Sequence, residues 1–435
     1  MALLREGSCH CTKSELDIFS VKPTQTSILG YQDVEYKPTS SLVENAPIEF
    51  HIPASGEEYI DLPHTMLYVQ AKIVKSDDSL LTSTDKTIGP VNYFLHTLFS
   101  EVQIYLNNKL VSFPSHMYPY RAYIESLLNY DEPAKSSHLQ QSLWFKDTAG
   151  YMDAVDANNK GFTKRFEFSK LSKTFDMLGY LHCDIFNQEK FLINGVELRI
   201  KLIPSKNSFC LMGETGSDGK VKLLDVALIV RKVSISASVK LSHSKILRQY
   251  TAKYPISRVQ LKAVTIAKGI MSKTIDNLIL GPLPKRVIIG FLNNDAFNGT
   301  FTTNPFHFKH FKYNFFSLYI DGTPVPSKPL QPNFDSGHFI RAYHTLFAGS
   351  GIDYLDEGNN IQRSDYAQGF SLLAFDLTPD QSANATSHWC LTKHGTLRME
   401  VHFSEALLST ISCLVYSEFD TELEVDGNRD VRINL

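Results

Sequence analysis

Apolar and polar residues alternate with a period of two in many parts of this 435-residue chain. In residues 196–202, which read VELRIKL, four aliphatic side chains fall on one face of an extended segment and three charged side chains fall on the other. Residues 397–403 repeat this pattern, and residues 67–73 and 234–241 also alternate. Such alternation is typical of antiparallel strands with one buried and one solvent-facing side. The sequence therefore predicts an all-β fold.

Helices are expected only as short elements in connecting segments. Apolar residues recur at helical spacing in residues 120–128, just after Pro119, and predict about three turns. Ser137 is a candidate cap for a second short helix that reaches Trp144. Strands and helices do not alternate regularly along the chain, which argues against a doubly wound α/β sheet.

The chain also contains an internal repeat. Three features of the first half recur, in the same order, about 200 residues later. They are a strand ending in a hairpin pair (Asn107-Asn108 and Asp321-Gly322), the tripeptide Arg-Ala-Tyr (121–123 and 341–343), and an alternating strand after a glycine (198–200 and 397–399). A repeat of about 200 residues is too long for a solenoid and suits a pair of β-sandwiches. We predict two tandem eight-stranded jelly-roll sandwiches with short helices in their loops.

The predicted organisation has four parts. They are an N-terminal arm (1–44), a first jelly roll (45–241), a linker (242–256), and a second jelly roll with an acidic C-terminal tail (257–435). Long loops are expected at residues 129–162 and 335–366, and loops of this length at one end of a sandwich usually contact something.

Composition excludes several classes of protein. With 43% hydrophobic and 20% charged residues the chain is neither disordered nor fibrous. A net charge of −3 argues against a protein built to coat nucleic acid. No apolar run is long enough to span a membrane, and the apolar stretch at the N-terminus is too short for a signal peptide. Six cysteines without a CxxC pair indicate a soluble protein of a reducing, intracellular compartment.

The sequence contains few candidate catalytic or metal-binding motifs. Glycine-rich phosphate loops, zinc-protease motifs and nucleophile elbows are missing from the sequence. His307 and His310 lie in an aromatic run, where packing is a better interpretation than metal binding. Cys9-His10-Cys11 is an alternative soft-metal cluster, disfavoured because it is isolated. We therefore assign no catalytic residue, cofactor or metal from the sequence.

Charge is unevenly distributed along the chain. Residues 226–275 contain no Asp or Glu but many bases, of which four are candidate contacts with a neighbouring subunit or a polyanion: Lys245, Arg248, Lys253 and Arg258. A later segment without bases carries a candidate acidic partner tail: Glu418, Asp420, Glu422, Glu424 and Asp426. The alternative interpretation is two solvated faces.

Several strings together resemble the major capsid protein of Polinton (Maverick) elements and the related adintovirus-like group, a double jelly-roll family. They are residues 56–62, 118–125, 143–148, 291–299, 341–347 and 398–403, and the resemblance covers nearly the whole chain. It implies a structural protein without catalytic residues or cofactors, whose homotrimers form pseudo-hexagonal capsomers of an icosahedral DNA-virus shell. The implied partners are further copies of the chain, a penton protein, other minor capsid proteins and packaged DNA. The implied location is the virion, assembled inside the host cell without secretion by a signal peptide.

Intersubunit burial in such an obligate assembly should exceed about 2,000 Å² per interface. Aromatic pairs in the loops are candidate anchors for it, at Trp144-Phe145 and Phe315-Phe316. The alternative for both pairs is ordinary sandwich core, which is the better interpretation for Phe316. Two rival functions stay open. An enzyme built from tandem jelly rolls would need clustered carboxylates or paired histidines at the junction, and a carbohydrate-binding protein would need exposed aromatic residues at loop tips.

Overall fold

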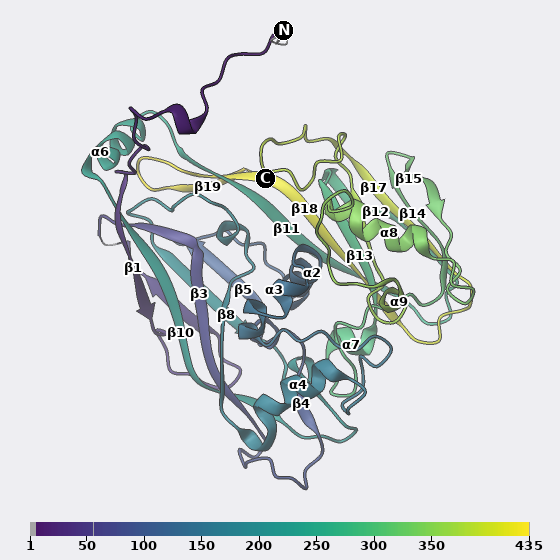
Figure 1. Ribbon diagram of the computed structural model, residues 1–435. Coiled ribbons are helices and arrows are strands. Elements are labelled where there is room, and N and C mark those ends of the chain that lie inside the picture. Colours follow the sequence, from purple (N-terminus) through teal and green to yellow (C-terminus); the bar gives the residue numbers. More distant parts are fainter. Residues whose placement is uncertain (1–5, 55, 435) are drawn as a thin grey trace.

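A computed structural model describes residues 6–54 and 56–434, and its strands form two β-sandwiches that stand side by side (Figure 1). In the first sandwich one sheet has the strand order β1-β10-β3-β7 and the other has the order β2-β8-β5-β6, with all pairs antiparallel. The bounds are β1 (Ile28–Tyr36), β10 (Lys220–Ile235), β3 (Tyr59–Val74), β7 (Phe175–Tyr180), β2 (Ile48–Ile52), β8 (Leu198–Pro204), β5 (Phe99–Leu106) and β6 (Lys109–Leu110).

The second sandwich repeats this strand order. Its sheets run β11-β18-β13-β16 and β12-β17-β14-β15, and β19 also pairs with β18. The bounds are β11 (Ala252–Ile266), β18 (Ile411–Val425), β13 (Arg286–Asn293), β16 (Leu372–Asp376), β12 (Ser272–Pro282), β17 (His394–Phe403), β14 (Tyr313–Ile320), β15 (Thr323–Leu330) and β19 (Val431–Asn434). Strand for strand the two sandwiches match in chain order, so the expectation of two tandem eight-stranded jelly rolls is confirmed.

The alternating segments become strands for the reason that the pattern predicts. In β8 the side chains of Leu198, Ile200 and Leu202 are buried, while Arg199 and Lys201 on the opposite face are half-buried. The β5–β6 hairpin turns at Asn107-Asn108, where φ is 46° and 66°, a left-handed conformation that asparagine tolerates well.

Helices lie in the connections, as expected, and among the described residues none is long and apolar enough to cross a membrane. The α-helices are α1 (Phe94–Thr97), α2 (Tyr118–Asn129), α3 (Glu132–Lys135), α4 (Lys160–Ser169), α5 (Asn207–Cys210), α6 (Ala237–Ile246), α7 (Asn294–Asn298), α8 (Ile340–Ser350) and α9 (Arg363–Tyr366). The 3-10 helices are η1 (Ser14–Leu16), η2 (His138–Ser142), η3 (Lys170–Ser172) and η4 (Asp184–Phe186), and the short strands β4 (Ile88–Pro90) and β9 (Leu211–Gly213) pair with each other. The repeated tripeptide lies in α2 and in α8, which follow β6 and β15 at equivalent places.

Each hydrophobic core contains residues from the other half of the chain. The core of the second jelly roll takes in buried residues of α2 and of the loop after it, including Tyr123, Leu127 and Trp144. The core of the first takes in Leu423 and Val431, from the ends of the second roll's strands. Figure 1 shows β11, β18 and β19 reaching from the second sandwich over the first. The two rolls therefore share their cores reciprocally.

Four sequence-based expectations need correction. The alternation in residues 234–241 does not continue as a strand, because β10 ends at Ile235 and α6 follows. The segment 242–256, expected to lack regular structure, holds the end of α6 and the start of β11. Strand β1 lies within the expected arm and forms a sheet edge. The cap at Ser137 begins a 3-10 helix without a side-chain capping bond, since its hydroxyl donates to Pro133 instead.

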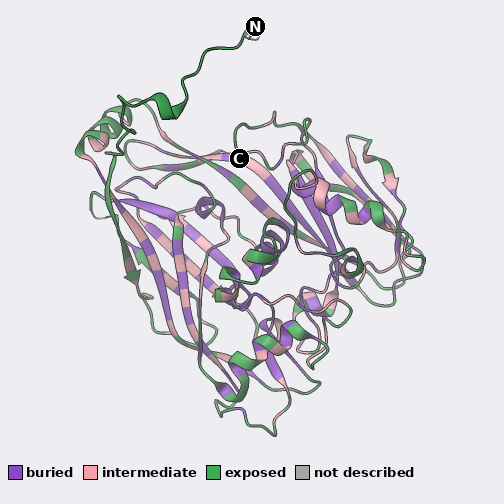
Figure 2. Cartoon of the chain, in the orientation of Figure 1, coloured by how far each residue is buried: buried purple, intermediate pink, exposed green. Residues whose placement is uncertain are grey.

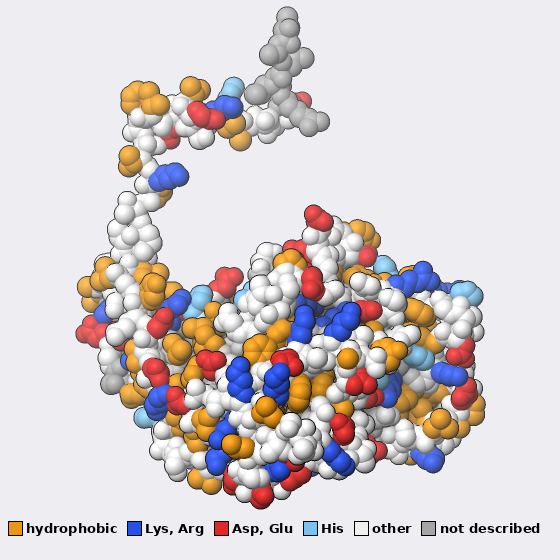
Figure 3. All heavy atoms as spheres, turned by 60° about the horizontal axis from the view of Figure 1, so that its bottom comes forward, with side chains coloured by type: hydrophobic (Ala, Val, Ile, Leu, Met, Phe, Trp, Pro, Cys, Tyr) orange, Lys and Arg blue, Asp and Glu red, His pale blue; other side chains and the backbone are white. Residues whose placement is uncertain are grey.

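The arm that precedes β1 lies away from the two sandwiches. It is exposed along its length (Figure 2), and in the space-filling view it stands clear of the body with hydrophobic side chains on its surface (Figure 3). Phe19 is 96% exposed and Val21 is 93% exposed. Within this chain, the described part of the arm does not bury these side chains, although large apolar groups are usually covered.

Candidate functional site

The four candidate bases do not form one patch. Lys245 and Arg248 are exposed near the C-terminal end of α6, whereas Lys253 and Arg258 lie on β11. The Arg258 guanidinium carbon lies 5.4 Å from the ring centre of Phe113, and burial lowers the pKa of this half-buried side chain. A contact of these bases with a neighbour or a polyanion stays a prediction, and Lys245, Arg248 and Lys253 are the three with exposed side chains.

The five acidic residues do not form a free tail. The first four belong to β18, a strand hydrogen-bonded on both sides, and Asp426 follows it directly. Their ion pairs lie within the chain: Glu418 with Arg286 (3.5 Å), Asp420 with Lys285 (2.6 Å), Glu422 and Glu424 with Lys253 (2.7 and 3.4 Å), and Asp426 with Arg432 (3.7 Å). Because β11 and β18 are antiparallel neighbours, the basic and acidic segments meet in one sheet of one molecule.

A buried charge network joins the two jelly rolls. Arg121 of α2 donates from Nε to Glu125 Oε1 (2.8 Å) and from Nη1 to Asp184 Oδ1 (2.6 Å). His182 Nδ1 lies 2.7 Å from the other Glu125 oxygen. From the second roll, the Tyr416 hydroxyl donates to Glu125 Oε1 at 3.3 Å. The Arg121 side chain thus holds carboxylates from two elements of the first roll beside β18 of the second.

The environment sets the charge state of these carboxylates. Burial opposes ionisation of Glu125, but Arg121 and His182 outweigh it and lower the Glu125 pKa to about 2. At Asp184 burial outweighs Arg121, so the pKa of this carboxyl is raised. The backbone N–H of Val259 in β11 also donates to Asp184 Oδ1 (3.2 Å). The carboxylates that the enzyme alternative requires do gather here, but Glu125 and Asp184 are both paired with Arg121. Hydrogen bonds from Tyr416 and Val259 to these two carboxylates connect the first roll to the second.

A cavity of about 830 Å³ opens beside the network. Its walls include Glu125, Lys285, Arg286 and Asp420, together with residues 383–386 of the loop between β16 and β17. Charges of both signs alternate around it, so the cavity presents no field of a single sign toward a polyanion.

The two long loops contact each other. The ammonium of Lys135 in α3 is buried and donates to the carbonyls of Leu127 and Asn359, each at 2.7 Å. Lys146 pairs with Asp365 at 2.7 Å across the same boundary. Burial, and then the charge of Lys146, lowers the pKa of Lys135 to about 7.

The aromatic pairs are divided between core and surface. Trp144 is 1% exposed, and its ring packs edge-on against Tyr93 with centres 5.0 Å apart. The expectation that Trp144 anchors a subunit interface is therefore wrong, because the side chain fills the second roll's core. Phe316 is also buried, in line with the core interpretation, and Phe145 and Phe315 are half-buried.

The histidines and cysteines singled out in the sequence lie apart. His310 stacks on Phe334 with ring centres 3.9 Å apart, and burial lowers its pKa to about 4. His307 pairs with Asp153 through Nδ1 at 2.8 Å. Cys9 and Cys11 are exposed in the arm.

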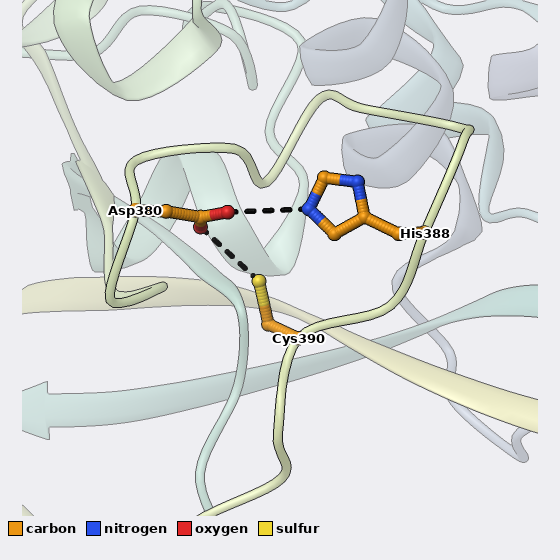
Figure 4. A group of neighbouring side chains, drawn as sticks. All are labelled: Asp380, His388 and Cys390. Atoms are coloured by element: carbon orange, nitrogen blue, oxygen red, sulfur yellow. Dashed lines mark hydrogen bonds and ion pairs between the residues drawn. The ribbon is translucent and has the colours of Figure 1, made fainter.

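The structure assembles a different group, which sequence reasoning missed. Asp380, His388 and Cys390 lie on the loop between β16 and β17, with their ligand atoms within 4.8 Å of one another (Figure 4). His388 Nε2 lies 3.2 Å from Asp380 Oδ2, and the Cys390 thiol donates to Asp380 Oδ1 at 3.2 Å. Hydrogen bonds from Ser382, Cys390 and His388 lower the pKa of Asp380. The only sequence signal was three ligand residue types within eleven positions.

No family model matches the chain. A search of curated proteins finds an uncharacterized protein of Caenorhabditis elegans that is 23% identical over 421 residues, covering 94% of this chain and 98% of the relative. The chain and this nematode protein are therefore similar over nearly their whole lengths.

Solved structures share the fold over nearly the whole chain. A chain of the Sputnik virophage aligns with a TM-score of 0.66 and 12% identity, over 100% of this chain and 94% of its own length. The PBCV-1 virus capsid aligns with a TM-score of 0.62 and 9% identity, over 96% of this chain and 99% of its own. The mavirus major capsid protein aligns with a TM-score of 0.56 and 12% identity, over 100% of this chain and 95% of its own. The chain has the double jelly-roll fold of these virus proteins.

Proposed function

We propose that this chain is a structural major capsid protein, whose homotrimers form pseudo-hexagonal capsomers that tile an icosahedral DNA-virus shell. One observation carries the proposal: two jelly rolls of identical strand order stand side by side in one chain, and solved capsid chains match that arrangement along nearly their whole length. Three chains contribute six jelly rolls of the same strand order. Three contacts, each between unlike surfaces of two chains, close them into a ring.

The proposal extends to the kind of genetic element that encodes the chain. The sequence strings resemble Polinton (Maverick) and adintovirus-like capsid proteins, and the mavirus protein shares the fold. The full-length nematode relative supports an element carried in animal genomes. The protein would reside in the virion, assembled inside the host cell, with a penton protein, minor capsid proteins and packaged DNA as further partners.

Self-association draws support from surfaces that the single chain leaves uncovered. Leu16, Ile18, Phe19 and Val21 of the arm are each at least 70% exposed, and a neighbouring copy in the capsomer would cover them. Burying apolar area of this kind is the usual driving force of obligate assembly.

Mass measurement and electron microscopy of the purified protein test the proposal. We expect a particle of 147.3 kDa, three times the chain's 49.1 kDa, with threefold symmetry and a hexagonal outline. A stable monomer, or hydrolytic turnover or glycan binding by that monomer, would contradict it and favour one of the rival functions.

Charge reversal tests the role of the basic segment. Reversing Lys245, Arg248 and Lys253 together to Glu should lower the yield of assembled particles or the DNA they retain. The matched control is Lys268→Glu. Lys268 is an exposed base of the same acid-free segment and lies just beyond the C-terminal end of β11. Equal particle yield and equal DNA content in both variants would remove this contact from the proposal.

A further inference from the structure

We propose that Asp380, His388 and Cys390 form a binding site for a Zn²⁺ ion, which fastens the loop between β16 and β17. The site rests on side-chain geometry and is independent of the proposed capsid role. It lies in residues 377–393, which connect two strands of the second jelly roll.

The donor atoms of the three side chains are close enough together to share one ion. A tetrahedral zinc ion holds oxygen and nitrogen at about 2.0–2.2 Å and sulfur at about 2.3 Å, which places neighbouring ligand atoms about 3.4–3.6 Å apart. His388 Nε2 lies 3.2 Å from Asp380 Oδ2, Cys390 Sγ lies 3.2 Å from the other oxygen, Oδ1, and one ligand atom from each side chain lies within 4.8 Å of the other two. A small outward movement of these side chains would therefore admit the ion.

A fourth donor atom lies beside these three side chains. The Ser382 hydroxyl lies 2.6 Å from Asp380 Oδ1, 3.3 Å from His388 Nε2 and 3.5 Å from Cys390 Sγ. This hydroxyl, or a water molecule that takes its place, completes a set of four donors.

Hydrogen bonds from neighbouring groups orient His388 and tie down the start of the loop that carries Asp380. The Ser387 hydroxyl lies 3.1 Å from Nδ1 of His388, which leaves Nε2 directed at the other ligands. The first half of the loop is tied to the end of β16, because Thr378 Oγ1 and the Ala383 N–H both donate to the Asp376 carboxylate, at 2.6 and 2.9 Å. One ligand thus stands on an anchored segment before any ion binds.

The donor set selects the class of metal. Thiolate, imidazole and carboxylate together suit zinc and related transition ions, whereas Mg²⁺ and Ca²⁺ take oxygen ligands. On binding, the Cys390 thiol loses its proton to solvent and the sulfur bonds the metal, while His388 binds as neutral imidazole and Asp380 as carboxylate.

The loop lines two cavities, so an ion bound to it would affect both. Residues 383–386 and Trp389 line the 830 Å³ cavity, whereas Cys390 and residues 391–394 line a second cavity of about 550 Å³. A bound ion would join the start of the loop to its end and fix the ridge between the two cavities.

The test is Zn²⁺ and Co²⁺ titration of full-length protein that carries Cys9→Ser and Cys11→Ser, which removes the other exposed thiols of the arm. We expect one Zn²⁺ per chain with a dissociation constant in the micromolar range or below, and a thiolate-to-cobalt charge-transfer band. Loss of a group that hydrogen-bonds a metal ligand costs about 10–100-fold in affinity, so Ser387→Ala should weaken zinc binding about 10-fold. Loss of a ligand itself should cost more, about 100-fold or more for each of Asp380→Asn, His388→Gln and Cys390→Ser.

The matched control is His344→Gln. His344 also lies 3.2 Å from a carboxylate, that of Asp353, but without a thiol beside it, so its loss should leave zinc affinity unchanged. Emission from Trp389, which is 49% exposed, should change on zinc binding, whereas buried Trp144 supplies a constant background. Equal zinc affinity in the parent and the three ligand variants, or a cobalt complex without the charge-transfer band, would overturn the proposal. Matching thermal unfolding of the metal-free variants shows that each has folded.

Discussion

The two jelly rolls have the same strand order but different means of closing their cores. The first roll is closed by ends of strands that belong to the second, including Leu423 and Val431. The second is closed by α2 and the aromatic loop after it, which belong to the first. The strand order is thus common to both rolls, whereas the segments that close the two cores differ and interlock them. Neither half has a complete core without the other, so we expect the chain to unfold in one cooperative transition.

The most damaging change should be Trp144→Ala. This residue lies in the first half of the sequence, but its side chain fills the core of the second roll, and truncating a buried tryptophan costs about 3–5 kcal/mol. Denaturant unfolding followed by signals from both rolls should show both destabilised together. Trp389→Ala, at an exposed position, is the control and should unfold like the parent. If only the first half loses stability, the reciprocal arrangement is wrong.

Glu125→Gln should rank close behind, because it leaves Arg121 buried without its full ion-pair partner. Breaking a buried pair costs about 3–5 kcal/mol. The Glu125 pKa is lowered from 4.5 to about 2 in the folded chain, so this carboxylate stabilises the fold above pH 4.5. That contribution is lost as the pH falls toward 2.

The pH dependence gives a sharp check of this network. In thermal unfolding, the difference between parent and Glu125→Gln should be largest near neutral pH and should shrink as the pH falls from 4.5 to about 2. A difference that stays constant over this range would show that Glu125 acts through packing and not through its charge.

Leu423→Ala tests whether the second roll contributes to the core of the first. The Leu423 side chain is fully buried in the first roll's core, although the residue belongs to β18 of the second roll. Truncating it should lower the free energy of unfolding by about 2–5 kcal/mol. Leu408→Ala, 85% exposed on the connection before β18, is the matched control. Unfolding midpoints in urea measure both, and equal midpoints would contradict the shared core.

The smallest effect should come from the ion pairs on β11 and β18. Lys285→Gln breaks a half-enclosed pair with Asp420 and should cost about 1 kcal/mol, whereas Lys253→Gln breaks exposed pairs and should leave the unfolding midpoint within error. The opposite order would mean that the solvent-facing pairs, and not the enclosed one, hold these strands together.

The sequence predicted the local features and missed the long-range ones. Alternation identified β8 and β17, and the paired turn residues located both hairpins, because these signals depend only on neighbouring residues. Residues 234–241 alternate equally well, but β10 ends at Ile235 and α6 begins at Ala237, since the pattern cannot show where a strand loses its pairing partner. Strand β1 went unnoticed because its side chains are mostly exposed and carry no apolar alternation.

Contacts between distant segments explain the errors about the site. The bases near residue 253 and the acids near residue 422 were both noticed, but only the antiparallel register of β11 and β18 shows that they meet within one chain. Trp144 looked like a surface anchor because it lies in a loop, and nothing local indicates that the loop enters another core. Asp380, His388 and Cys390 converge through loop closure, which sequence spacing alone does not reveal.

The sharing of core residues between the two rolls affects how the protein folds during its synthesis. During synthesis an N-terminal domain usually folds as soon as it leaves the ribosome. Here Val431 belongs to the core of the first roll, so that roll stays unfinished until nearly the last of these residues has been translated. A chain that stops before Val431 would thus expose part of the first roll's core to solvent, although all the strands of that roll had already been made.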